Sequence, residues 1–446
     1  MALTTIPGMS IIEPALGAAP SFGVSATLAA NEILAARHRR GEPVLHMAFG
    51  EAGLDVHPLL RDALADAAGR NGYGPVAGLP ALREAAAGYW TRRDLPTTPD
   101  QVVTGPGSKA LLFGLIAAIG GDVVLPRPSW VSYAAQASLA GVQARLVPGA
   151  AGVPEAARVA NVAAAARAAG RPVRAVIVTV PDNPTGLLAQ ASAIRALCAV
   201  AEQHNLVIIS DEIYRDLIFD AAPPYTSPSA FSAERTVVTS GVSKNLALGG
   251  WRLGVVRLPE GPLGAELRDR LLAIASEIWS APAAPVQEAA ALAFREPAAL
   301  VAHVAASRRL HARVARAVAA RFAAHGAVVP TPQAAFYVYP GFGPVADVLR
   351  HKHGITADTD LAGLLLRRYG VGVLPGSAFG EESWRLRLRV ACSMLYGSTS
   401  ERRSAALASD DPCALPWIAE SLDRLDEVLA EVVSLRITGP GGARDA

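Results

Sequence analysis

A regular alternation of short β-branched runs with helix-like segments constrains the fold of this chain more than any other feature. The runs begin near residues 101, 122, 143, 173, 206 and 236, and segments with helical spacing separate them. Such alternation indicates βαβ units, in which neighbouring strands run parallel within one sheet. Ligands of such sheets bind beyond the carboxyl ends of the strands. We therefore predict an α/β fold with a mostly parallel sheet, and expect functional side chains just after the runs.

The composition is that of a compact globular protein with a small-molecule ligand. Of the 446 residues, 51% are hydrophobic, which excludes a disordered chain. No apolar stretch approaches the roughly 18 residues of a membrane-spanning helix, so we expect no membrane segment. The 41 basic and 39 acidic residues offer no basic excess for nucleic acid or an anionic membrane.

The cysteines and the N-terminal residues indicate in which cellular compartment the protein is expected. Cys198, Cys392 and Cys413 lack the spacing of a metal site, so no metal is expected. The N-terminal residues show neither the charged nor the apolar block of a signal peptide. We expect a cytoplasmic protein, with residues 1–20 as a loosely docked lead-in.

Helical patterns flank the alternating region on both sides. They cover residues 25–40 with Ser25 as a candidate cap, and residues 58–69, 79–89, 263–279, 285–294, 298–325 and 418–435. The pattern at 298–325 is long enough to link two lobes. Residues 393–417 form a polar stretch longer than ordinary connections, which we interpret as a lid or specificity loop.

Polar residues stand just after several predicted strands. Gly107, Ser108 and Lys109 precede an apolar helix, whose free N–H groups could bind a phosphate. Trp130 could stack on an aromatic ring, although such a residue is more often part of the core. The Asn183 amide could bond a phenolate or only complete a turn. Asp211, at a buried strand end, needs a cation beside it, either from the protein or a protonated heterocyclic nitrogen.

Two loops carry further candidates. Lys244 stands in a glycine-rich stretch after an apolar run, and Arg252 follows eight residues later. This arrangement suits a covalently held, phosphorylated cofactor, although a surface loop that happens to contain both cations is an equal alternative. Tyr73, on a turn-rich loop, is either a lid on a hydrophobic patch or a donor to a ligand. Gly50 permits close backbone approach or simply ends a strand.

Together these residues resemble the class I/II aminotransferase family, pyridoxal-phosphate-dependent enzymes of fold type I in the aspartate aminotransferase superfamily. The resemblance rests on the order and spacing of Asn183-Pro184-Thr185-Gly186, Asp211 with Tyr214, Lys244, and Gly250-Trp251-Arg252-Leu253-Gly254. It extends to Gly50-Glu51, Tyr73, Gly107-Ser108-Lys109, Trp130, and residues 375–380 and 387–391. It implies a three-layer αβα large domain with a mostly parallel seven-stranded sheet, plus a smaller α+β domain. We expect residues 45–315 to form the large domain, and residues 1–44 with 316–446 to form the small one.

The resemblance also implies a role for each candidate. Lys244 would hold pyridoxal 5'-phosphate as a Schiff base and then shuttle a proton. Asp211 would pair with the pyridinium nitrogen, Asn183 and Tyr214 would bond the phenolate oxygen, and Trp130 would stack on the ring. The phosphate would be held by Gly107, Ser108, Lys109, Ser243 and Arg252, with Tyr73 reaching it from the second subunit of a homodimer that shares its active sites.

The substrate's α-carboxylate would be clamped by Arg387 or Arg389, aided by Asn183 and the backbone near Gly50. The family pattern fits Arg389 somewhat better. Because alternation along a strand puts both arginines on one face, the other could read a second acidic group or form a salt bridge with a neighbouring carboxylate.

The chain departs from the family pattern at three places. Gly241 stands where a phosphate-binding serine is frequent, which leaves Ser240 or Ser243 as substitutes. Residues 52–54 read Ala-Gly-Leu where many relatives have Pro-x-Phe, which removes rigidity from a loop that lines the substrate. Ala334 and Ala335 replace two glycines and narrow the room there.

The implied reaction is transamination of an α-amino acid to its α-keto acid by a ping-pong cycle. The motifs indicate the cofactor and not the bond that is cleaved, so elimination or carbon–carbon bond formation, for example on S-adenosylmethionine, is the alternative. A non-catalytic binding module with this fold is a further alternative. It is disfavoured because every main catalytic position is filled.

Overall fold

The computed structural model describes residues 26–220 and 222–434, so the expected lead-in and the candidate cap Ser25 lie outside the described residues. The helices are α1 Ala26–Arg39, α2 Pro58–Ala67, α3 Pro80–Thr91, α4 Ser108–Ile119, α5 Ser132–Leu139, α6 Ala156–Ala168, α7 Ala191–Gln203, α8 Pro262–Ile278, α9 Ala284–Arg295, α10 Ala298–Ala324, α11 Ala346–His353, α12 Asp358–Tyr369, α13 Ser400–Ala408 and α14 Pro416–Val433. The helices predicted on either side of the alternating region are all present with similar bounds.

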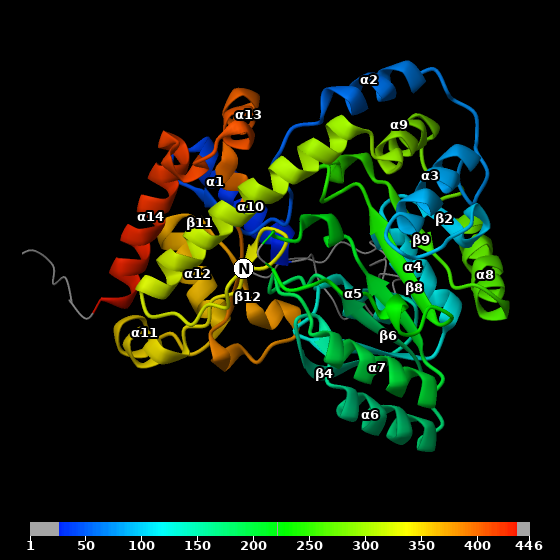
Figure 1. The fold of residues 1–446 in the computed structure, drawn as a ribbon. Coiled ribbons are helices and arrows are strands. Elements are labelled where there is room, and N and C mark those ends of the chain that lie inside the picture. The colour runs from blue at the N-terminus through cyan, green and yellow to red at the C-terminus, as the bar shows by residue number, and fades with distance from the viewer. Residues whose placement is uncertain (1–25, 221, 435–446) are drawn as a thin grey trace, which may run out of the picture.

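The strands are β1 Leu45–His46, β2 Val102–Gly105, β3 Asp122–Arg127, β4 Ala144–Ala150, β5 Val153–Pro154, β6 Val173–Thr179, β7 Val207–Asp211, β8 Thr236–Gly241, β9 Gly254–Arg257, β10 Tyr337–Val338, β11 Val371–Gly372, β12 Leu374–Pro375 and β13 Leu388–Ala391. Within the described residues, eight of them form the main sheet, in the order β2-β9-β8-β7-β6-β3-β4-β5 (Figure 1).

The main sheet is mostly parallel, as predicted. Strands β4, β3, β6, β7 and β8 are parallel, whereas β9 runs antiparallel to both of its neighbours. The six β-branched runs became β2, β3, β4, β6, β7 and β8, and β9 completes the seven strands that were expected. The eighth strand, β5, has two residues and turns back against β4, so the predicted count was one too low.

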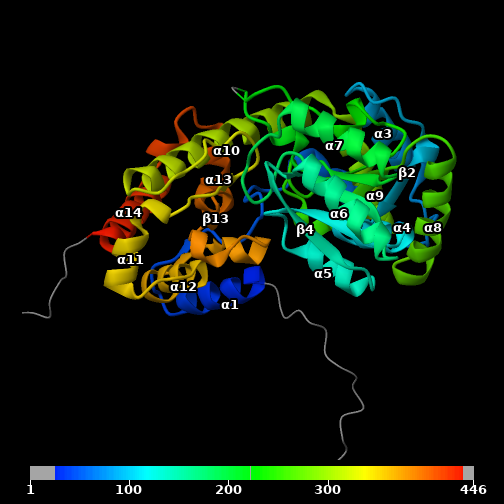
Figure 2. The same ribbon diagram turned by 90° about the horizontal axis from the view of Figure 1, so that it is seen from below.

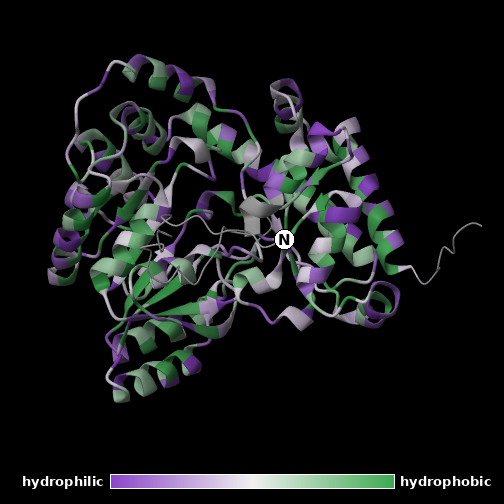
Figure 3. Ribbon diagram, turned by 180° about the vertical axis from the view of Figure 1, so that it is seen from behind, coloured by the Kyte–Doolittle hydropathy of each residue, from purple (hydrophilic) through white to green (hydrophobic). Residues whose placement is uncertain are grey.

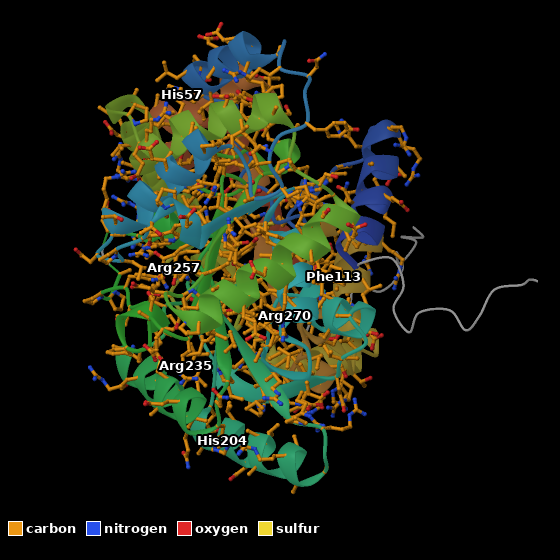
Figure 4. The ribbon with its side chains drawn as sticks, turned by 90° about the vertical axis from the view of Figure 1, so that its right-hand side faces the viewer. His57, Phe113, His204, Arg235, Arg257 and Arg270 are labelled. Atoms are coloured by element: carbon orange, nitrogen blue, oxygen red, sulfur yellow. The ribbon has the colours of Figure 1, made fainter. Side chains whose placement is uncertain are left out.

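Helices cover both faces of this sheet, because successive strand residues point to opposite sides. Ile177 and Ile209 face a core shared with α4, α5 and α8, whereas Val176 and Ile208 face a core shared with α6 and α7. Figure 3 shows these strands as hydrophobic, and Figure 4 shows α4 and α8 side by side at Phe113 and Arg270. The three-layer αβα architecture is therefore confirmed.

A second lobe is built around the small sheets β1-β11 and β10-β13-β12. Its core joins α14, α12 and the C-terminal half of α10 to Leu45 and Met47 from the start of the described chain. Helix α10, 27 residues long, runs from the first lobe into the second (Figures 1 and 2). The domain boundary predicted at residue 315 falls inside this helix and stays a prediction.

The polar stretch at residues 393–417 is not the loose loop that its composition indicated. It contains α13 and two short 3₁₀ turns, Ser393–Tyr396 and Pro412–Ala414. The Thr399 side chain caps α13, and Ala406 is fully buried in the core of the second lobe. The sequence signal was misleading because a few apolar residues of this stretch, among them Leu395, Ala406 and Leu407, are enough to pack it against the core of the second lobe.

In the described part of the chain, no single helix combines the length and apolarity needed to cross a membrane. Helices α9 and α10 pass that test only when taken together, and they are bent by 81° with respect to each other.

Candidate active site

A cavity of about 690 Å³ lies beyond the carboxyl ends of the parallel strands, between the two lobes. It gathers most of the predicted site residues: Gly50, Ser108, Lys109, Trp130, Asn183, Asp211, Tyr214, Ser243, Lys244, Arg252 and Arg389. Residues that the sequence analysis gave no role also line it, among them Phe49, Glu51, Tyr133, Thr179, Ile213 and Tyr337. Tyr73 and Arg387 are not part of its wall.

Lys244 reaches into this cavity from the loop after β8. Its Nζ donates a hydrogen bond of 2.5 Å to the carbonyl oxygen of Gly50. Burial, together with the nearby Arg389, lowers the pKa of Lys244 to about 8. This shift brings the uncharged amine, which a nucleophile or proton acceptor requires, closer to neutral pH than for an ordinary lysine.

Asp211 ends β7 and is almost fully buried. Its Oδ2 accepts a hydrogen bond of 2.8 Å from the Tyr133 hydroxyl, and its Oδ1 accepts one of 3.2 Å from Thr239. Burial raises the pKa of Asp211, whereas these donors lower it. No cation among the described residues is hydrogen-bonded to it, so the carboxylate is oriented by neutral donors and is able to accept from a cationic ligand.

Two tyrosines and one asparagine add polar atoms to the wall. The hydroxyls of Tyr214 and Tyr337 are 2.8 Å apart, and burial raises the pKa of both. Asn183 is 4% exposed, and among the described residues its Oδ1 has no hydrogen-bond partner. A buried amide without a partner is costly, so this atom indicates a polar ligand.

An anion cradle forms where α4 begins. Gly107, at φ 87°, precedes the helix, and a Cβ at this position would lie 2.3 Å from Nη2 of Arg252. A Cβ at Gly254 would lie 2.3 Å from the Ser108 nitrogen, so both glycines allow the close packing of β9, α4 and Arg252. The first N–H groups of α4 and the Arg252 guanidinium thus come together at one end of the cavity.

Lys109 and Trp130 stand beside this cradle. The Lys109 Nζ lies 5.1 Å from the ring centre of Trp130, whose ring meets Tyr133 edge-on. Burial and the charge of Arg252 lower the pKa of Lys109. Trp130 thus presents an aromatic surface to the cavity and is not sealed in the core, which was the alternative considered from the sequence.

The two arginines considered for the substrate carboxylate, Arg387 and Arg389, lie in different surroundings. Arg389 is 3% exposed, and its Nη2 donates a hydrogen bond of 2.5 Å to the carbonyl oxygen of Ala48. No carboxylate within the described residues forms an ion pair with it, and its Nε is without a partner there. Arg387 lies outside the cavity, with its Nε 3.8 Å from Oε2 of Glu381. The salt-bridge alternative for the second arginine therefore holds for Arg387.

The remaining predicted positions show why some candidates were ambiguous. Tyr73 is fully exposed, so it covers no hydrophobic patch of the described chain and is not the lid considered from the sequence. A Cβ at Gly241 would lie 2.8 Å from the Leu253 carbonyl oxygen, which leaves little room for a serine there. Of the two proposed substitutes, Ser243 lines the cavity, whereas Ser240 does not.

Ala335, one of the two alanines that replace family glycines, adopts φ 58°, a left-handed conformation that a glycine would take without strain.

Tyr133, Thr179 and Tyr337 are the main site residues that the sequence reasoning missed. Thr179 ends β6, so the rule that ligands bind beyond strand ends could have identified it. Tyr133 stands on α5 and Tyr337 in the second lobe. No local pattern distinguishes these two from ordinary core tyrosines, because only the folded chain brings them to the cavity.

Comparison with known proteins agrees with this geometry. Residues 42–396 match the family model described as aminotransferase class I and II. A probable aspartate/prephenate aminotransferase of Thermus aquaticus is 34% identical over 254 residues, which are 55% of this chain and 64% of that protein. The aspartate/prephenate aminotransferase of Cereibacter sphaeroides is 33% identical over 373 residues, 81% of this chain and 89% of that protein. The structure of the Thermus thermophilus aspartate aminotransferase with maleate gives a TM-score of 0.75 at 27% identity and covers 91% of this chain and 97% of that chain.

Proposed function

The chain belongs to the class I and II aminotransferase family, and from this premise we propose that it is a pyridoxal-phosphate-dependent enzyme that converts an α-amino acid to its α-keto acid in a ping-pong cycle. The observation that carries the proposal is the shared cavity of Lys244 and Asp211, with the anion cradle in the same wall and Arg389, which forms no ion pair with a carboxylate of the described residues. An amine, a buried carboxylate and two separate anion sites are what such a cofactor and an amino acid require.

The residues present fit pyridoxal phosphate. The start of α4, Ser243 and Arg252 would hold its phosphate, and the Asn183 Nδ2 group and the Tyr214 hydroxyl would donate to its phenolate oxygen. Trp130 would cover its ring, and Asp211 would keep the ring nitrogen protonated. When bound, the cofactor supplies a ring that accepts the electrons released at the substrate carbon.

Lys244 is the residue to which we assign the Schiff-base link and the proton transfer. A pKa of about 8 lets the amine be neutral often enough to act as a base, while the Gly50 carbonyl fixes its direction. Arg389, held by Ala48, would bind the α-carboxylate as a two-pronged donor with its remaining N–H groups.

The names of the relatives suggest the first substrate to test, and the exposure of Tyr73 suggests an assembly. Proteins similar to this chain are named aspartate and aspartate/prephenate aminotransferases, so L-aspartate is the first amino donor to test. We also propose a homodimer in which Tyr73, fully exposed here, reaches the phosphate site of the second subunit. Three cysteines without a disulfide in the structure support action in a reducing cytoplasm.

The test is a single half-reaction. The purified protein, loaded with pyridoxal phosphate, is mixed with each of a panel of amino acids and with no keto-acid acceptor. A transaminase releases up to one equivalent of keto acid per site, keeps the nitrogen, and shows a lasting change in the cofactor spectrum. Continued turnover with release of ammonia would instead indicate elimination. A protein that takes up no cofactor would contradict the proposal.

A further inference from the structure

One wall of the cavity is an irregular segment, residues 47–55, that has neither helix nor strand. Phe49, Gly50 and Glu51 of this segment line the cavity, and the Gly50 carbonyl accepts the hydrogen bond from Lys244. The position of this wall therefore affects both the space for the substrate and the direction of the amine.

The first half of the segment is attached to strand β13 and the turn after it. The Ala391 N–H donates a hydrogen bond of 2.8 Å to the Met47 carbonyl, and Arg389 donates to the Ala48 carbonyl. The Ser393 hydroxyl donates to the Glu51 carbonyl. These contacts fix residues 47–51 and leave the second half to be held in another way.

The second half packs against the interior and is tied to α13: Ala52 is fully buried and Leu54 is 9% exposed. Gly53 adopts φ 66°, where a Cβ would lie 2.2 Å from the Ser393 carbonyl oxygen, and no proline restricts residues 52–54. At the end of the segment, Asp55 Oδ1 lies 3.0 Å from Nη1 of Arg403. This ion pair links the segment to a helix more than three hundred residues away in the sequence.

Helix α13 is a firm support for that ion pair. Ala406 is buried in the second lobe, and Leu407 and Cys413 pack against the same core. The Arg403 Nε donates a hydrogen bond of 3.0 Å to the Gly397 carbonyl, so the guanidinium itself is held in place. The family match ends at residue 396, and α13 lies beyond it.

We propose that Arg403 is a positioning residue, which acts through Asp55 to hold the 47–55 wall in the shape that binds the amino acid. The expected change in KM rests on the proposed function, whereas the support of the segment by the Arg403–Asp55 ion pair does not. Because both side chains are about one third exposed, loss of the pair is expected to raise KM by about two- to fivefold. The chemical step should change less, since Arg403 touches no reacting group.

The experiment uses the loaded full-length enzyme and the variants Arg403→Gln, Asp55→Asn, their double variant, and Arg403→Lys. Arg402→Gln is the matched control, because Arg402 is the preceding residue on α13 and stacks on Trp417. Two properties are measured: hydrogen exchange of the peptide that contains residues 47–55, and KM and kcat for L-aspartate.

We expect faster exchange in this peptide for Arg403→Gln and Asp55→Asn, and protection close to wild type for Arg403→Lys and Arg402→Gln. The double variant should have the same KM as either single variant, because both remove one interaction. Unchanged exchange in Arg403→Gln, equal effects of Arg402→Gln, or additive KM changes would overturn the proposal. If hydrogen exchange responds as expected while the wild-type protein releases no keto acid, the positioning role of the Arg403–Asp55 pair is retained and the proposed function is wrong.

Discussion

The Tyr133 hydroxyl donates a hydrogen bond of 2.8 Å to Oδ2 of Asp211 and joins helix α5 to the end of β7. The same hydroxyl lies 2.9 Å from Oγ1 of Thr179, at the end of the neighbouring strand β6. Together with the Thr239 hydroxyl of β8, which donates to Oδ1, Tyr133 orients the carboxylate before any ligand binds. Preorganisation of this kind is the main way in which a protein stabilises charge in a transition state.

Replacing Asp211 tests whether this charge matters for the reaction. Asp211→Asn should still bind the cofactor but slow the half-reaction with amino acid by at least roughly a hundredfold, typical of a lost preorganised charge. Tyr133→Phe removes one donor to a charged group and should cost about tenfold. Stopped-flow absorbance measures both rates. Near-normal rates in Asp211→Asn would count against its role at the ring nitrogen.

The two lysines of the cavity provide a matched pair of variants. Lys244→Ala should abolish turnover and leave a cofactor that dialysis removes, because the covalent link is lost. Lys109→Ala should retain a cofactor that borohydride fixes to the protein, as intact-protein mass spectrometry can show. If Lys244→Ala sustained multiple turnovers, another residue would have to be the anchor.

The lowered pKa of Lys244 predicts how the cofactor-free protein reacts with acetic anhydride. Below a pH of about 8 the amine is protonated and protected, and above it the neutral amine is acylated. Arg389→Met should raise this midpoint, because the Arg389 charge disfavours the ammonium form, whereas Arg387→Met should leave it unchanged. Peptide mapping across a pH series gives the midpoint. Equal midpoints in all three proteins would contradict the assigned cause.

Because Arg389 lines the cavity and Arg387 lies outside it, substitutions at the two positions should have unequal effects on substrate binding. Arg389→Lys loses the two-pronged geometry in a buried site and should raise KM for the amino acid by about ten- to a hundredfold. Arg387→Lys keeps the charge beside the partly exposed Glu381 and should change KM by less than about threefold. Steady-state kinetics with L-aspartate decides between them. Larger effects at Arg387 would make it the clamp.

Gly107 in the anion cradle and Gly120 at the end of α4 have similar backbone angles. Replacing each with alanine therefore distinguishes a steric clash in the cradle from backbone strain alone. Gly107→Ala would place a Cβ 2.3 Å from Arg252, whereas Gly120, at φ 67°, has no atom within 4 Å of its Cβ position. Each substitution costs on the order of 1–3 kcal/mol in backbone strain, because both residues combine a positive φ with a ψ of 158° or 173°, a region essentially restricted to glycine. Only Gly107→Ala should weaken pyridoxal phosphate binding, by about tenfold or more. Fluorescence titration measures this affinity, and equal losses in both variants would point to backbone strain alone.

Much of the site was predictable because its residues stand in local patterns. Asp211, Asn183 and the Gly107 turn follow β-branched runs, and the rule about strand ends places such residues together. Tyr133, Tyr337 and the Arg403–Asp55 pair could not be predicted, because nothing near them in the sequence indicates their partners. The stretch at residues 393–417 was misjudged, since its polarity concealed the few apolar side chains that fold α13 onto the second lobe.

The sequence by itself determined the alternating fold and singled out Lys244, Asp211 and the Gly107 turn as the candidate amine, carboxylate and phosphate-binding turn. These follow from periodicity and from residue types that few chemistries require in that order. Local pattern could not distinguish Arg387 from Arg389, and only the tertiary structure shows that Arg389 lines the cavity while Arg387 lies outside it. One arginine meets Glu381 outside the cavity, whereas the other is buried beside it without a carboxylate in the described chain, and that difference in surroundings suits Arg389 to a ligand's charge.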